Sequence, residues 1–137
     1  MQKIMFATAG CAALLLGIAA AQAEAPHLQG FMKTVSAANS ALAKSVMERN
    51  ATETSANAQK MADAFVKVQA HFEEDHLTDG VNLAKRAHKA SMDLIAAANA
   101  GDWEKASGEL KVVSGTCQAC HSQYRERLPD GTYKMKH

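Results

Sequence analysis

Seven residues near the C-terminal end repeat at alternating steps of three and four positions. This spacing places them on one face of a helix, where they form the stripe that packs against neighbouring helices. The stripe contains two cysteines, and its members are Trp103, Ala106, Leu110, Val113, Cys117, Cys120 and Tyr124. Whatever the two cysteines hold must therefore lie inside the protein, between this helix and the rest of the fold.

The two cysteines belong to a C-x-x-C-H sequence that ends at His121. This spacing is the attachment signature of c-type haem. One helical turn directs both thiols and the imidazole to the same side, so that the thiols can reach two vinyl groups and the imidazole the iron. A C-x-x-C pair also occurs in redox-active disulfides and as half of a zinc site. These alternatives stay open at the level of the motif.

The first 23 residues have the features of a secretory signal peptide. Lys3 precedes an apolar run over residues 4–20, and residues 21–23 read Ala-Gln-Ala, a small-x-small cleavage pattern. The run continues past Cys11, which favours ordinary cleavage over lipid attachment at that cysteine. We expect cleavage after residue 23, a periplasmic location and no stable membrane insertion afterwards. An uncleaved membrane anchor is the alternative.

Removal of 23 of the 137 residues leaves 114, which is about one domain. It also leaves two of the three cysteines, both in the C-x-x-C-H sequence, so that no thiols remain for a disulfide framework. The whole chain carries 15 basic and 14 acidic residues, and this balance argues against nucleic-acid binding. A core of this size is small, and a covalently held haem would enlarge its apolar surface.

Three more amphipathic helices are predicted before the last one. The first runs from about residue 27 to 49, with Asn39 as a polar residue at a skipped core position; its stripe is Leu28, Met32, Val35, Leu42 and Val46. The second opens at Asn50, with Glu53 completing a capping box. The third runs from about residue 79 to 100, with Thr78 as its N-cap and a core stripe made mostly of small residues.

The last helix is expected to open at Asp102, after a stop at Gly101, and to end near Leu128. Residues 129–131 read Pro-Asp-Gly, which indicates a turn. Four amphipathic helices with short connections predict an all-α antiparallel four-helix bundle over residues 24–128, with a covalently attached haem c among the helices. Residues 129–137 are expected to be a polar C-terminal tail that is separable from cofactor binding.

With these features the sequence resembles the class II cytochromes c, the cytochrome c′ family, over essentially the whole mature chain. The strongest part is Gly-Asp-Trp at residues 101–103, followed by the C-x-x-C-H sequence and then Tyr124 and Arg125. The sequence departs from the family at Leu28, where many members have arginine, and after Leu128, where members usually end.

The resemblance implies a left-twisted four-helix bundle with one covalent haem c and its iron. His121 is then the proximal iron ligand, and Arg125 lies near a haem propionate. Members of the family are often homodimers, a point on which this sequence does not decide.

The family divides on the second axial position of the iron. Met32 falls where one branch supplies a methionine ligand, and a thioether there favours reduced iron and raises the reduction potential. The first hypothesis is therefore a non-enzymatic periplasmic electron carrier with His121 and Met32 as iron ligands, which exchanges electrons with redox partner proteins.

Two other hypotheses remain. If Met32 only packs, as methionine does in irregular gaps, the protein is a five-coordinate haem protein that binds nitric oxide or carbon monoxide. The other is a thiol–disulfide module that uses Cys117 and Cys120. The sequence disfavours this module because the cysteines fall in the middle of a helix and no βαβ pattern surrounds them.

Overall fold

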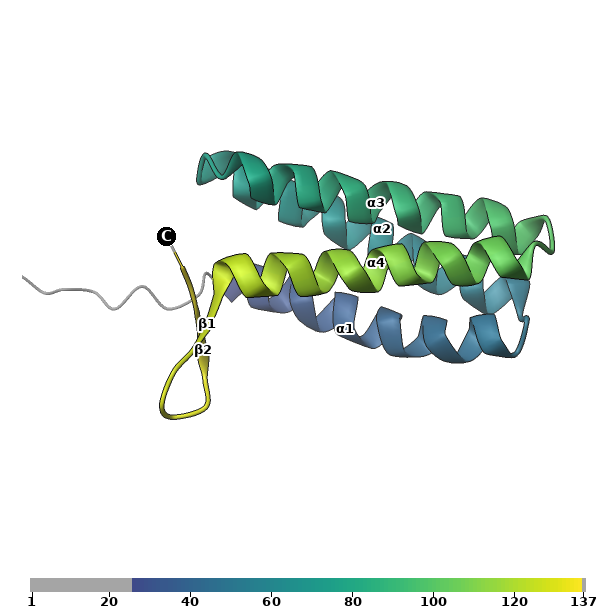
Figure 1. Cartoon of the computed structure of the whole chain (residues 1–137), viewed down its shortest axis with the longest axis horizontal. Helices are drawn as coiled ribbons and strands as arrows, with labels where there is room; N and C mark the ends of the chain where they lie inside the picture. Colours follow the sequence, from purple (N-terminus) through teal and green to yellow (C-terminus); the bar gives the residue numbers. More distant parts are fainter. Residues whose placement is uncertain (1–25, 137) are drawn as a thin grey trace, which may run out of the picture.

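The computed structural model describes residues 26–136, which form four α-helices and a C-terminal β-hairpin (Figure 1). The helices are α1 (Pro26–Met47), α2 (Ala51–Glu74), α3 (Thr78–Asn99) and α4 (Trp103–Tyr124). The hairpin consists of β1 (Arg125–Arg127) and β2 (Tyr133–Met135). The expected signal peptide, residues 1–23, lies outside the described residues.

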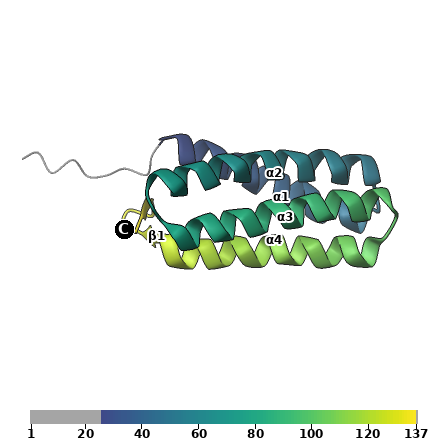
Figure 2. The same ribbon diagram turned by 90° about the horizontal axis from the view of Figure 1, so that it is seen from above.

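Successive helices run in opposite directions and lie side by side, joined by short connections (Figures 1 and 2). The predicted packing of four helices is thereby confirmed. The two central helices in the chain, α2 and α3, pack most extensively, whereas α1 and α4 touch each other much less. Within residues 26–136, every helix lacks the combination of length and apolar character that a membrane crossing requires.

Most of the predicted helix caps are found. The Asn50 side chain accepts a hydrogen bond from the Glu53 N–H at 3.1 Å, and the Asp102 carboxylate accepts one from the Lys105 N–H at 3.0 Å. Gly101 has φ +72°, the left-handed conformation that glycine adopts without strain. The N-cap predicted at Thr78 is wrong, because α3 already includes that residue. Leu77 occupies the cap position without a side-chain cap and packs against the core instead.

The last helix ends at Tyr124, four residues before the predicted end at Leu128. The Tyr124 carbonyl accepts a hydrogen bond from the Lys136 N–H at 2.8 Å. Pairing with the returning chain thus takes the place of further helical turns. The turn predicted at residues 129–131 is present, and the Leu128 N–H donates to the Thr132 carbonyl at 2.8 Å. The segment expected to be a separate tail is therefore folded back onto the end of α4.

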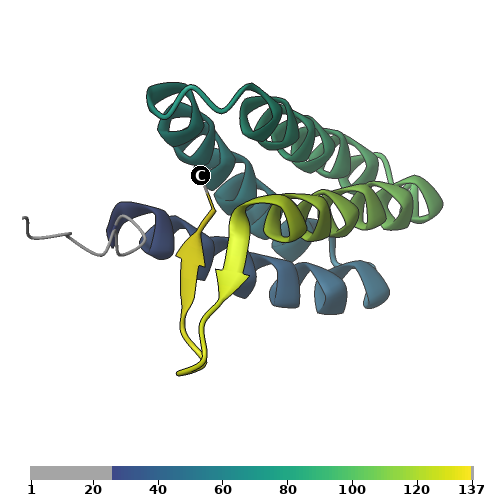
Figure 3. The same ribbon diagram turned by 60° about the vertical axis from the view of Figure 1, so that its left-hand side comes forward.

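The bundle has two halves. The closed half surrounds the α1–α2 and α3–α4 connections, and its core side chains are fully buried, among them Leu42, Met61, Leu94, Ala106 and Val113. The open half comprises residues 28–39 of α1, 65–72 of α2, 80–84 of α3 and 116–124 of α4, together with the hairpin. Figure 3 shows the hairpin and the start of α1 at this same end of the bundle.

Candidate functional site

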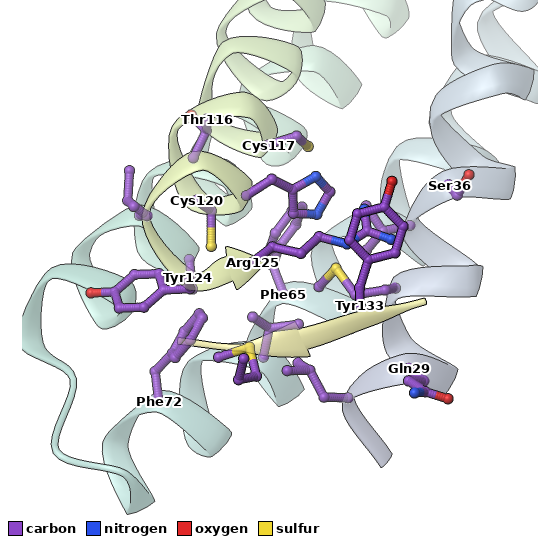
Figure 4. A pocket seen from close by; sticks show the side chains of 18 of the residues that line it. Gln29, Ser36, Phe65, Phe72, Thr116, Cys117, Cys120, Tyr124, Arg125 and Tyr133 are labelled. Atoms are coloured by element: carbon purple, nitrogen blue, oxygen red, sulfur yellow. The ribbon is translucent and has the colours of Figure 1, made fainter. Parts of the chain in front are cut away.

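A cavity of about 520 Å³ occupies the open half of the bundle (Figure 4). Residues of all four helices and of the hairpin line it. Its volume is in the range of protein sites that bind a cofactor or a drug-sized ligand. The structure brings every site residue predicted from the sequence to this one cavity, namely Met32, Cys117, Cys120, His121 and Arg125.

Cys117 and Cys120 lie half-buried on the cavity side of α4, and both thiols are free. Figure 4 shows them on the same helix, one turn apart. Burial raises the pKa of the Cys117 thiol, and it raises the pKa of Cys120 from 9.0 to about 11. Both thiols are therefore protonated at neutral pH. A redox-active C-x-x-C pair needs a thiol of lowered pKa, so this environment speaks against the thiol–disulfide hypothesis.

His121 is the next residue on the same helix, and its side chain lines the cavity from an exposed position. The helix continues for one more turn, because the Arg125 N–H donates to the His121 carbonyl. The two cysteines and the histidine of the C-x-x-C-H sequence thus lie on one continuous helical segment that borders the cavity. Among residues 26–136, no group of three or more His, Cys, Asp and Glu side chains is arranged to hold a metal ion.

The wall opposite α4 is formed by α1. Met32 is half-buried there, packs against the hydrophobic core and lines the cavity. Figure 4 shows Gln29 and Ser36 of the same helix across the cavity from the two cysteines. Asn39 lines the cavity as well, and its buried side-chain oxygen has no hydrogen-bond partner within the described residues. Asn39, the polar residue at the skipped core position of the first helix, therefore belongs to the cavity wall.

The apolar floor of the cavity comes mainly from α2 and the end of α4. Phe65, Val68 and Phe72 are buried on α2 and line the cavity. The Phe72 ring lies 5.1 Å from the Tyr124 ring, measured between centroids, in a tilted arrangement. Aromatic pairs in this range add attraction beyond their burial. The inner side of the cavity is therefore lined by packed apolar side chains.

The hairpin supplies a wall that the sequence analysis did not predict. Thr132, Tyr133 and Met135 line the cavity, and the guanidinium carbon of Arg125 lies 3.4 Å from the centroid of the Tyr133 ring. The turn signal at residues 129–131 indicated a reversal of the chain. Strands of three residues, however, are too short to show an alternating pattern in the sequence.

The charges around the cavity are one-sided. Lys33 and Arg125 line it, whereas the described lining residues include no aspartate or glutamate. The chain as a whole has nearly equal numbers of basic and acidic residues, so this local excess is not a reflection of composition. An occupant with an apolar body and an anionic edge is the chemical complement of such a cavity.

Comparisons of the chain with protein-family models, curated proteins and solved structures found no match. The resemblance to class II cytochromes c, drawn from the motif and its late position in the chain, stays a prediction. The interpretation of the cavity depends on the residues themselves and on their arrangement.

Proposed function

We propose that the cavity holds one covalently attached haem c and that the protein is a periplasmic electron carrier. The observation that carries the proposal is the convergence of Cys117, Cys120 and His121 from α4 and Met32 from α1 on a single, mostly apolar cavity. Two thiols, an imidazole and a thioether are the set of groups that attaches haem c and fills both axial positions of its iron.

The residues present fit this cofactor in charge as well as in chemistry. The porphyrin is a large apolar disc, and the floor formed by Phe65, Val68 and Phe72 offers it an apolar surface. The propionates are anionic, and Arg125 and Lys33 are the cations that line the cavity. Carboxylates, which would repel the propionates, are missing from the described lining residues.

Each residue has a defined role in the proposal. The thiols of Cys117 and Cys120 would hold the haem by addition to its two vinyl groups; each addition would form a carbon–sulfur bond and move the thiol hydrogen to the adjacent carbon, so no oxidant would be needed. His121 would hold the iron. A bound haem supplies one-electron exchange between ferric and ferrous iron, and the apolar floor keeps water out and so adjusts the reduction potential.

Met32 decides between the electron carrier and the second candidate function. Its position on the wall opposite α4 suits an axial ligand. Its packing against the hydrophobic core equally suits a residue that only fills space, which favours a five-coordinate haem protein that binds nitric oxide or carbon monoxide. We favour ligation because the side chain lines the cavity on the helix that faces the histidine.

The attachment is tested on protein matured with its leader in a bacterial periplasm. The haem should remain with the polypeptide after acid–acetone extraction, and a variant with Cys117→Ala and Cys120→Ala should release it. Free thiols and no haem in the wild-type protein would refute the proposed function.

The axial ligand is tested by the absorption spectrum of the same protein. With Met32 as a ligand, oxidised protein is low-spin and the reduced protein binds carbon monoxide slowly. Met32→Ala should turn the iron high-spin and open it to carbon monoxide. The control is Met92→Ala, which removes an exposed methionine of α3 and should change neither property. A wild-type protein that is already high-spin would favour the gas-binding candidate.

A further inference from the structure

The β-hairpin has one face toward the cavity and one face away from it. Its register pairs Arg125 with Met135 and Arg127 with Tyr133. Alternate residues of a strand point to the same face, so Arg125, Tyr133 and Met135 share a face. All three line the cavity. On the opposite face the remaining pair, Glu126 and Lys134, forms an ion pair at 3.2 Å between Oε2 and Nζ.

Tyr133 is the diagonal cross-strand neighbour of Arg125, a position that long and aromatic side chains can reach. The Arg125 guanidinium carbon lies 3.4 Å from the Tyr133 ring centroid, and Figure 4 shows the arginine side chain extended toward the ring. Guanidinium groups stack on aromatic faces in this way. Stacking occupies the flat face of the guanidinium and leaves its N–H edge available to an anion.

The position of Tyr133 is fixed from the helix that carries the cysteines. The Lys136 N–H donates to the Tyr124 carbonyl at 2.8 Å, and the Lys136 ammonium donates to the Ser122 carbonyl at 3.0 Å. At the other end of the hairpin, the Asp130 carboxylate accepts hydrogen bonds from the N–H and the hydroxyl of Thr132 at 2.9 and 2.6 Å. The position of the ring is therefore set by main-chain and turn contacts that do not involve the Arg125 side chain.

We propose that Tyr133 is a positioning residue, which holds the Arg125 guanidinium at the cavity so that it faces the carboxylates of the bound cofactor. The inference rests on the proposed function and makes the C-terminal hairpin a part of the haem site. A cation held at the cavity disfavours the ferric state relative to the ferrous state, which carries one positive charge less. The stack therefore raises the reduction potential of the iron.

The test is the reduction potential of periplasmically matured protein, measured at one fixed pH and ionic strength. Arg125→Gln should lower the potential, and Tyr133→Leu should lower it in the same direction by no more than that. Tyr133→Phe keeps the ring and should retain the wild-type potential. The double variant Arg125→Gln with Tyr133→Leu should match Arg125→Gln alone, because the tyrosine acts through the arginine.

The matched control breaks the outer face of the same hairpin. The double variant Glu126→Gln with Lys134→Gln removes the outer ion pair without a change in net charge, and it should leave the potential unaltered. Equal shifts in this control and in Tyr133→Leu would reduce Tyr133 to a structural role and overturn the proposal.

The proposal would also be overturned if the shift in reduction potential of the double variant equalled the sum of the shifts of Arg125→Gln and Tyr133→Leu. It would be overturned as well if neither single variant changed the potential. Failure of the proposed function would be visible earlier, as wild-type protein without covalent haem. The two failures are therefore distinguishable.

Discussion

The closed and open halves of the bundle are built from the same four helices but complete their cores differently. In the closed half Leu42, Leu94 and Val113 are each 0% exposed, and the buried Thr54 and Ser45 hydroxyls bond to each other at 3.0 Å. In the open half the core side chains border a cavity, and Met32 and the two cysteines remain half-buried. The side chains of the closed half bury one another, whereas those of the open half leave a cavity.

The difference has its origin in the elements that close each end. Two short helix connections bring the ends of all four helices together in the closed half. Over their whole length α1 and α4 have little mutual contact, and at the open half the hairpin stands at the end of α4 (Figure 3). The aromatic side chains Phe72 and Tyr124 pack against each other there and line the cavity.

The largest expected effect contrasts two leucines of α3. Leu94→Ala removes a fully buried side chain from the closed half and should cost about 3–4 kcal/mol in the free energy of unfolding. Leu83→Ala acts on a half-buried side chain that already borders the cavity, so the loss should be about 1 kcal/mol. Denaturant unfolding of the cofactor-free polypeptide measures both. Equal losses would contradict the division into two halves.

The second prediction concerns the reactivity of Cys120 in the cofactor-free polypeptide. Burial, together with the charge interaction with Cys117, raises its pKa from 9.0 to about 11 and so reduces the thiolate fraction; alkylation at neutral pH should slow about 100-fold relative to the unfolded chain. A Cys117→Ser variant without residues 1–23 isolates this thiol. It also removes the charge interaction with Cys117 that helps to raise the pKa of Cys120, so the alkylation rate should rise with a midpoint above pH 9.0 but below about 11.

The same pKa also makes the stability of this polypeptide depend on pH. Below pH 9.0 the Cys120 thiol is protonated in both the folded and the unfolded state, so it contributes no pH dependence. Between pH 9.0 and about 11 the unfolded state loses its proton first, and the free energy of unfolding should fall. Fast alkylation at pH 7 would mean that the cavity is aqueous and not apolar.

The smallest effect concerns how the open half is packed at the start of α3. A methyl group on Gly80 would lie 2.8 Å from the Phe72 ring, which is closer than side chains tolerate. Gly80→Ala should therefore destabilise the protein by about 1–2 kcal/mol despite its better helix propensity. Gly108→Ala on α4 meets nothing within 4 Å and should stabilise by about 0.5–1 kcal/mol. Thermal unfolding distinguishes the two signs.

The bundle and most of the candidate site could be predicted because long helices repeat their pattern many times. The stripe from Trp103 to Tyr124 covers six turns and sets the direction of both cysteines, and Asn50 and Asp102 mark helix starts through local hydrogen bonds. These signals act between residues close in sequence, where periodicity and capping chemistry are informative.

The remaining part of the site depends on contacts that have no sequence period. The two strands of the hairpin have three residues each, and helix continuation to Leu128 was the expectation from the turn signal alone. The stack of Arg125 on Tyr133 arises only once the hairpin register is set. The end of α4 was therefore misplaced, and Tyr133 and Met135 were missed as residues of the cavity wall.

The place of α4 as the last helix has a consequence for the order of events in the cell. The residues of α1, α2 and α3 are synthesised before any residue of the C-x-x-C-H sequence exists, and those of the hairpin are added later still. The cavity therefore cannot form until translation has passed residue 136. Under the proposed function, attachment of the cofactor is therefore a late step, and a message truncated before Cys117 yields a product without the attachment cysteines.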